Sequence, residues 1–122
     1  ILSWLCSKVY TIERVPFLGK AAQERLNMLG YSNIEVRIGD GSLGLREFAP
    51  YDGIVVTSGA PSVPQPLKDQ LADDGLLVVP VGNNASQELT VVEKKNDSFI
   101  QTENCSCVFV PLIGKYGWQE ND

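Results

Sequence analysis

Residues 51–64 constrain the fold of this chain more than any other segment. Ile54, Val55 and Val56 form an unbroken run of β-branched apolar residues, which is typical of a strand buried on both faces of a sheet. The run then passes into small and turn-forming residues. In open α/β folds, ligands bind at the carboxyl edge of the sheet, where such a loop lies. We interpret residues 57–64 as one wall of a site, with an ordinary strand-to-helix loop as the alternative.

Segments typical of helices and strands alternate on both sides of this run. A helix is expected from Pro16, with Leu18, Ala22, Leu26 and Leu29 on one face and Gly30 ending it. A second helix is expected to end at residues 73–75. Strands are expected at residues 8–13, 34–38, 53–57, 76–81, 88–94, 98–102 and 105–110, with a hairpin around residues 96–97. This order predicts a mostly parallel α/β sheet with an antiparallel C-terminal edge.

The composition excludes several classes of function. The 122 residues are 43% hydrophobic and 20% charged, as in a single globular domain. The net charge is -5 and no basic cluster occurs, which argues against nucleic acid and anionic membranes as partners. No apolar run approaches the ~20 residues of a membrane span. The chain has no histidine, so Ser-His-Asp and Cys-His catalysis are excluded and no metal site is expected.

The cysteines indicate a reducing compartment. Cys6, Cys105 and Cys107 are odd in number and lack the spacing of a disulfide framework or a redox motif. The sequence also begins without a basic segment followed by a long apolar run. We therefore expect structural thiols and a cytoplasmic location.

Two acidic residues end predicted strands, and each has two interpretations. Glu13 ends the first strand, where a carboxylate can accept ribose hydroxyls; the alternative is a solvated surface residue. Asp40 lies between two glycines after the next strand, where it can accept an adenine amino group; the alternative is a turn aspartate. No Gly-x-Gly-x-x-Gly phosphate turn is present, which argues against a nicotinamide-dependent oxidoreductase.

Motifs that carry a family resemblance cover nearly the whole chain. They are VYTIER at residues 9–14, GYSNIEV at 30–36, GDG at 39–41, APYDGIVVT at 49–57, AP and VPQ between 60 and 65, LVVPVG at 77–82, QEL at 87–89 and FVPLIG at 109–114. In this order they resemble the protein-L-isoaspartate O-methyltransferase family. The resemblance implies a class I S-adenosylmethionine-dependent methyltransferase fold, Rossmann-like, with a seven-stranded sheet whose last strand is reversed.

The resemblance also implies a function and a set of site residues. The reaction would methylate the side-chain-derived carboxylate of L-isoaspartyl residues in damaged proteins and peptides, with S-adenosyl-L-methionine as cofactor. The implied cofactor residues are Glu13 at the ribose, Arg14 beside it, Asp40 and Gly41 at the adenine, and Gln87 nearby. The implied substrate residues are Ala60, Pro61, Val63, Pro64, Val110 and Leu112.

The chain departs from the family pattern at its N-terminus. The family would have about 80 further residues there, carrying a first strand, a glycine-rich cofactor loop and a serine near the substrate. We therefore expect residues 1–122 to be a partial methyltransferase domain without a catalytic residue of its own. The absent strand would lie between the strands at Val9 and Ile54, leaving two rows of backbone groups unpaired. We expect weak cofactor binding, no turnover and self-association through these strands; the alternative is a non-catalytic Rossmann-like binding or assembly module.

Overall fold

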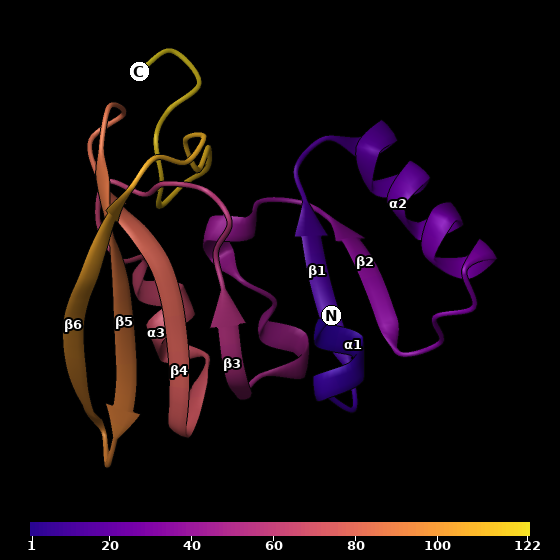
Figure 1. The fold of residues 1–122 in the computed structure, drawn as a ribbon, viewed down its shortest axis with the longest axis horizontal. Coiled ribbons are helices and arrows are strands. Elements are labelled where there is room, and N and C mark those ends of the chain that lie inside the picture. The colour runs from indigo at the N-terminus through magenta and orange to yellow at the C-terminus, as the bar shows by residue number, and fades with distance from the viewer. The chain divides into compact units, whose positions relative to one another are not determined.

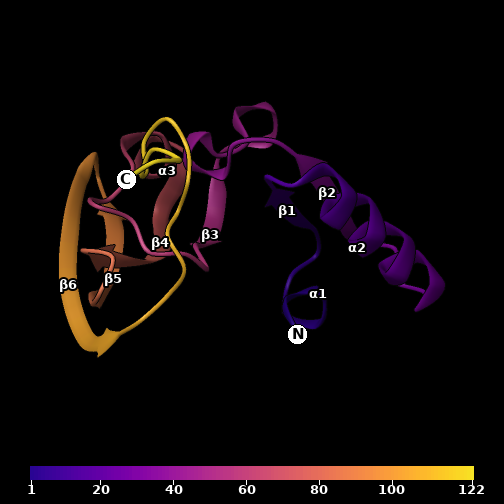
Figure 2. The same cartoon turned by 90° about the horizontal axis from the view of Figure 1, so that it is seen from above.

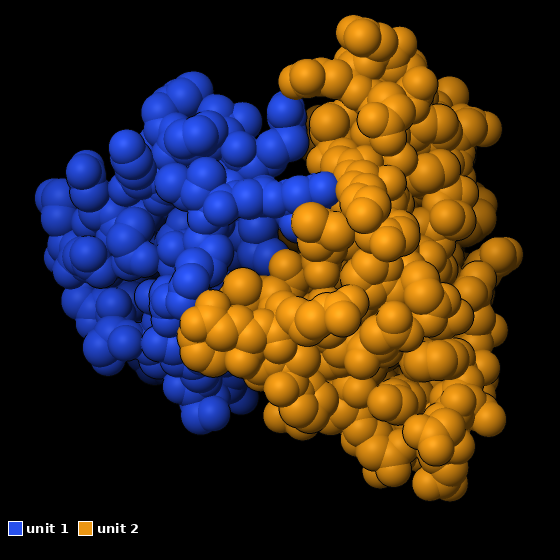
Figure 3. All heavy atoms as spheres, turned by 180° about the vertical axis from the view of Figure 1, so that it is seen from behind, with its two compact units in different colours: residues 1–41 blue, residues 42–122 orange.

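The chain forms two compact units, each with its own sheet. The computed structural model describes all residues from 1 to 122, and the units are Ile1–Gly41 and Ser42–Asp122 (Figure 3). The first unit has a two-stranded sheet and the second a four-stranded sheet. No helix has the length and apolar composition that a membrane crossing requires.

The first unit is a parallel β-α-β arrangement preceded by a short helix. Its elements are α1 (Leu2–Leu5), β1 (Val9–Glu13), α2 (Pro16–Met28) and β2 (Ile34–Ile38) (Figure 1). β1 and β2 pair in parallel from Val9 opposite Ile34 to Glu13 opposite Ile38. Gly30 follows the helix with a φ of 81°, a left-handed conformation that favours glycine. Both strands, the helix and its glycine stop were predicted correctly.

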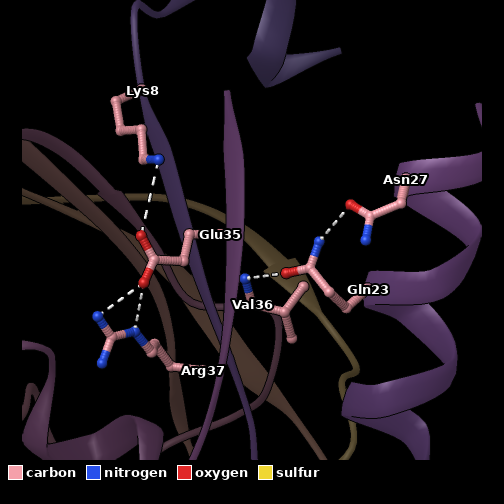
Figure 4. Close-up of polar contacts among 6 residues, drawn as sticks. All are labelled: Lys8, Gln23, Asn27, Glu35, Val36 and Arg37. Carbon is pink, nitrogen blue, oxygen red and sulfur yellow. Dashed lines mark hydrogen bonds and ion pairs between the residues drawn. The ribbon is translucent and has the colours of Figure 1, made fainter. Parts of the chain in front are cut away.

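Polar side chains fasten α2 to the outer edge of β2 (Figure 4). The backbone N–H of Val36 donates to Gln23 Oε1 at 3.0 Å, and Gln23 Nε2 donates to Asn27 Oδ1 at 3.0 Å. On the same strand, Glu35 pairs with Arg37 at 2.6 Å and with Lys8 at 3.6 Å. A side chain from α2 thus satisfies a backbone donor that would otherwise be open to another strand.

The second unit is a mixed sheet in the order β3-β4-β5-β6. Its elements are two 3-10 turns (Gly41–Leu43, beginning at the unit boundary, and Arg46–Phe48), β3 (Tyr51–Val55), α3 (Gln65–Asp69), β4 (Leu71–Gly82), β5 (Gln87–Lys95) and β6 (Ser98–Cys107). β3 and β4 are parallel, whereas β4–β5 and β5–β6 are antiparallel. The predicted antiparallel C-terminal edge is confirmed, with two strands, β5 and β6, in place of the three expected.

The segment before the predicted strand at residues 76–81 was assigned wrongly. α3 ends at Asp69, and residues 71–75 already belong to β4. Within that stretch Asp74 has a φ of 63°. We had interpreted the Asp-Asp-Gly sequence at residues 73–75 as the end of a helix. It is instead an irregularity inside a long strand, where the register to β3 shifts between Tyr51 and Gly53.

The C-terminal hairpin was predicted correctly at its turn and wrongly at its far end. Asn96 and Asp97 have φ values of 47° and 67°, the left-handed pair that a two-residue hairpin turn needs. The expected separate strand at residues 105–110 does not form, because residues 105–107 are the end of β6. The register between β5 and β6 shifts between Glu88 and Thr90. Such a bulge bends a strand, and β6 curves along its length in Figures 1 and 2.

β3 differs from the expected strand buried on both faces. It pairs only with β4, so it is an edge strand of its sheet. Ile54 and Val56 are half-buried and pack on the core, whereas the side chain of Val55 is 56% exposed. The sequence alone does not reveal this, because an apolar run looks the same whether or not a neighbouring strand covers it.

The hydrophobic core lies entirely in the second unit. Its buried members come from the loop after β3, from α3, from β4 and β5, and from the C-terminal segment: Ala60, Leu67, Leu71, Leu77, Val79, Val92 and Leu112. In residues 1–41 the only buried residue is Gly19. The first unit therefore has little buried apolar surface of its own to stabilise it.

Candidate functional site

The two acidic strand ends singled out in the sequence meet at one edge of the first unit. Glu13 is the last residue of β1 and lies opposite Ile38, the last residue of β2. The backbone N–H of Gly39 donates to the carbonyl of Glu13 at 3.0 Å, so Asp40 follows one residue beyond this bond. Both acidic residues are half-buried. The structure thus brings the chain positions of Glu13 and Asp40 to the same sheet edge, as the sequence analysis expected.

The carboxylate of Glu13 is held by its own turn. Its Oε1 accepts a hydrogen bond from the backbone N–H of Val15 at 2.9 Å. This bond fixes the side chain at the start of α2. An ionised carboxylate has about four acceptor positions, so the bond to Val15 leaves capacity for hydroxyl donors.

Gly19 allows α2 to approach the ends of both strands. A Cβ at this position would lie 2.9 Å from Ile38 Cγ1 and 3.5 Å from Glu13 Cβ. A glycine inside a helix costs about 1 kcal/mol relative to alanine. The structure gives a reason for this glycine, because any larger side chain would press against the residues that end β1 and β2.

Arg14 and Gly41 flank the two acidic residues along the chain. Arg14 is exposed directly after Glu13. Gly41 follows Asp40, and a Cβ there would meet no atom within 4 Å. The backbone is therefore open on that side, as a close approach to a ligand requires. These placements are compatible with the expected cofactor roles of Arg14 and Gly41, which stay predictions.

A second set of predicted residues meets at the carboxyl end of β4. The Ala60 N–H donates to the Pro80 carbonyl at 2.8 Å, and the Gly82 N–H donates to the Ala60 carbonyl at 3.0 Å. On the other side, Gly59 forms a parallel bridge with Pro111. The loop after β3 therefore lies between β4 and the C-terminal segment, and the expected substrate residues of both segments are brought together.

These substrate candidates divide by exposure. Ala60, Pro64 and Leu112 are buried, and Ala60 and Leu112 belong to the core cluster. Pro61 is exposed, Val63 is half-buried and Val110 is 71% exposed. Only the latter three present side-chain surface to a ligand, and the buried three support them from below.

Gln87 is a buried connector between two loops. It is the first residue of β5 and is 3% exposed. Its Nε2 donates to the Asn83 carbonyl at 2.5 Å, and its Oε1 accepts from the Phe109 N–H at 2.7 Å. No buried side-chain nitrogen or oxygen in the chain lacks a hydrogen-bond partner. The expected contact of Gln87 with the cofactor stays a prediction, and the bonds observed here are structural.

Sequence reasoning missed the residues that hold the C-terminal segment. Trp118 Nε1 donates to the Gly59 carbonyl at 3.1 Å, and the Trp118 N–H donates to the Leu112 carbonyl at 2.8 Å. Ser42 is fully buried, and its Oγ accepts from the Tyr116 N–H at 3.1 Å. A lone tryptophan in a polar tail was the signal available, since a buried indole N–H generally has a partner.

The cysteines are free thiols, as their spacing predicted. Burial, and then the neighbouring Cys105 and Glu88, raise the pKa of the Cys107 thiol. A raised pKa keeps the sulfur in its neutral, less reactive form. This favours a structural role for Cys107 over nucleophilic chemistry.

Comparisons with known proteins agree with the resemblance. The sequence model of the family described as protein-L-isoaspartate(D-aspartate) O-methyltransferase matches residues 4–117. The chain is 46% identical over 120 residues to a protein-L-isoaspartate O-methyltransferase of Dictyoglomus turgidum, covering 98% of this chain and 54% of the relative. It is 49% identical over 119 residues to the protein of that name from Methanocella arvoryzae, covering 98% and 63%. The chain thus spans little more than half the length of these curated relatives.

Two solved structures share the fold. A protein-L-isoaspartate O-methyltransferase matches with a TM-score of 0.83 at 28% identity, over 90% of this chain and 35% of that chain. A second, from Plasmodium falciparum and described as a complex with S-adenosyl-L-homocysteine, matches with a TM-score of 0.76 at 26% identity, over 87% and 52%. The predicted fold class, the α/β fold of class I methyltransferases with a mixed sheet, is confirmed.

Proposed function

Because the chain belongs to the protein-L-isoaspartate O-methyltransferase family, we propose that it serves the S-adenosylmethionine-dependent methylation of L-isoaspartyl residues in damaged proteins. The parallel β1-α2-β2 unit supports a Rossmann-like cofactor half. The free cysteines support a cytoplasmic location. Peptides and proteins that contain isoaspartyl residues are the proposed substrates.

One observation carries the cofactor part of this proposal: Glu13 ends β1, and Asp40 follows the end of the neighbouring parallel strand β2 by two residues. The Gly39–Glu13 backbone bond fixes the spacing of the two chain positions. Carboxylates accept hydrogen bonds from hydroxyl and amino groups, which are the donors that the ribose and adenine of an adenosine offer. These acceptors match the donors of the cofactor, with Glu13 assigned to the ribose and Asp40 with Gly41 to the adenine.

The proposed reaction needs little chemistry from the protein. The bound cofactor supplies an activated methyl group. The nucleophile is the substrate's own carboxylate, which is ionised near pH 7 because such groups have a pKa of about 4. No general base is required, so a chain without histidine is compatible with it. The task left to the protein is to hold the carboxylate in line with the methyl group, and such orientation is worth on the order of 7–11 kcal/mol in favourable models.

The exposed residues at the carboxyl end of β4 are the proposed substrate side. Pro61, Val63 and Val110 offer apolar surface, whereas Ala60, Pro64 and Leu112 fix their backbone in place. Apolar surface of this kind suits the main chain and flanking side chains of an extended peptide. The isoaspartyl carboxylate itself is assigned no partner among these residues.

The cofactor assignment can be tested by calorimetry with S-adenosylhomocysteine on the protein expressed from its whole reading frame. Glu13→Ala and Asp40→Ala are each expected to raise the Kd at least about tenfold, since hydrogen bonds to charged groups contribute roughly 1.5–3 kcal/mol. Glu24→Ala, which removes an exposed carboxylate from α2, is the matched control and should leave the Kd unchanged. Thermal melts of all three variants separate lost binding from lost folding.

Other outcomes have clear meanings. Unchanged affinity in both folded variants would remove Glu13 and Asp40 from the cofactor site. No binding of S-adenosylhomocysteine by the unsubstituted protein would support the alternative, a non-catalytic binding or assembly module.

A further inference from the structure

The amide of Gln87 joins two segments that are far apart in the sequence. One is the loop after β4, reached through the Asn83 carbonyl; the other is the segment after β6, reached through the Phe109 N–H. Gln87 pairs with Cys107, the last residue of β6. Its side chain therefore contacts a residue, Phe109, that lies two positions beyond the end of that strand.

Gly59 provides the space that the Gln87 side chain occupies. A Cβ on Gly59 would lie 2.8 Å from Gln87 Cδ and 3.0 Å from its Cγ. The Gly59 N–H donates to the Val110 carbonyl at 2.7 Å, and the Leu112 N–H donates to the Gly59 carbonyl at 2.8 Å. Gln87 and Gly59 therefore hold the same C-terminal segment through hydrogen bonds at Phe109, Val110 and Leu112.

The segment that they hold presents apolar side chains to solvent. Val108 and Val110 are 73% and 71% exposed, while Leu112 turns into the core. Val110 lies on backbone that is held at Phe109, Val110 and Leu112, so it has a definite position and a low entropic cost of binding. This is the property expected of a contact surface for an extended peptide.

We propose that Gln87 is a positioning residue for the substrate side of the site, acting through the Phe109 N–H to fix Val110, and that it does not bind the cofactor. This inference rests on the proposed function and changes the role that the family resemblance implied for Gln87. The amide has a protein partner on both its oxygen and its nitrogen, and its 3% exposure leaves almost no surface for a ligand.

Two measurements test the proposal, the KM for an isoaspartyl peptide and the Kd for S-adenosylhomocysteine. If Gln87 bound the cofactor, its substitution would change both. In the protein expressed from its whole reading frame, Gln87→Met keeps the size of the side chain and removes both hydrogen bonds. We expect the KM for an isoaspartyl peptide to rise about tenfold, the amount that corresponds to one or two lost hydrogen bonds. The Kd for S-adenosylhomocysteine should stay within about twofold, because the proposed cofactor residues, Glu13 and Asp40, belong to residues 1–41 and not to this segment. Gln101→Met, at an exposed glutamine of β6, is the matched control and should change neither value.

A second variant disturbs the hydrogen bonds of the Gln87 amide through a neighbouring residue. Gly59→Ala displaces the flexible end of Gln87 and leaves its amide intact, so it should raise the same KM and spare the same Kd. If Gln87→Met does not fold, Gly59→Ala decides the question. The proposal is overturned if either folded variant weakens S-adenosylhomocysteine as strongly as Glu13→Ala does, or if both leave the peptide KM unchanged. An unsubstituted protein that neither binds S-adenosylhomocysteine nor methylates the peptide would overturn the proposed function, and this inference with it.

Discussion

At the residue scale, Gly19 shows two opposing effects of a single methyl group. Alanine is favoured over glycine inside a helix by about 1 kcal/mol. Against this, the new Cβ would lie 2.9 Å from Ile38 Cγ1, and overpacking of this kind costs about 1–3 kcal/mol. We expect the second effect to win, so Gly19→Ala should lower the free energy of unfolding by about 1 kcal/mol in urea titrations.

A second substitution identifies the cause of that loss. Ile38→Ala removes the atom that collides, and in the double variant the alanine at position 19 should regain its helical advantage. Ala21→Gly, at an exposed position of the same helix, reports the propensity effect alone. A Gly19→Ala protein more stable than the original would mean that α2 shifts away from β2 at little cost.

At the element scale, the hairpin between β5 and β6 has a turn that glycine would suit better. Asn96 and Asp97 both have positive φ, and Asn-Gly is the pair most favoured in such turns. Asp97→Gly should raise the free energy of unfolding by about 0.5 kcal/mol, because relief of the left-handed strain exceeds the added entropy of the unfolded chain. Asp97→Asn is the control and should have little effect, whereas Asp97→Val should destabilise. Thermal melts would measure all three, and a less stable Asp97→Gly protein would contradict this account of the turn.

The elements that the sequence predicted well are those whose signals are local. Gly30 ends α2 and the Asn96-Asp97 pair turns the hairpin because each acts within a few residues. The end of β6 was missed because Cys105 belongs to the strand through a register shift opposite β5, which no local pattern records. Residues 71–75 were missed because the Asp-Asp-Gly sequence has the composition of a turn, although it lies within β4.

The residues of the candidate site also differ in whether their sequence signal is local or depends on distant segments. The meeting of Glu13 and Asp40 at one sheet edge could be predicted from the sequence because each lies at or just after the end of a strand that its own residues define, while their cofactor roles stay predictions. The Gln87–Phe109 bond spans 22 residues and the Trp118–Gly59 bond spans 59. Such bonds depend on how distant segments meet, and composition or spacing cannot predict them. The exposure of Val55 was missed for a similar reason, since it depends on the absence of a strand beside β3.

At the scale of the whole molecule, four strands pair on one side only, namely β1, β2, β3 and β6. β1 pairs only with β2 and β3 pairs only with β4, so each has one edge without a neighbouring strand. The outer edge of β2, by contrast, has the Gln23 side chain bound to Val36. Unprotected edges accept further strands, and natural proteins often block them with lysine.

We therefore expect the 122-residue chain to self-associate, and the tendency should depend on β3. Val55 is 56% exposed on this strand, and Val55→Lys adds a charge that opposes strand pairing. Sedimentation velocity at increasing concentration should show the unsubstituted chain associating and the Val55→Lys chain staying closer to a monomer. Met28→Lys, on the exposed side of α2, adds the same charge away from any strand and should associate like the original. If Met28→Lys suppresses association as much as Val55→Lys does, net charge is the cause and the strand edge is not.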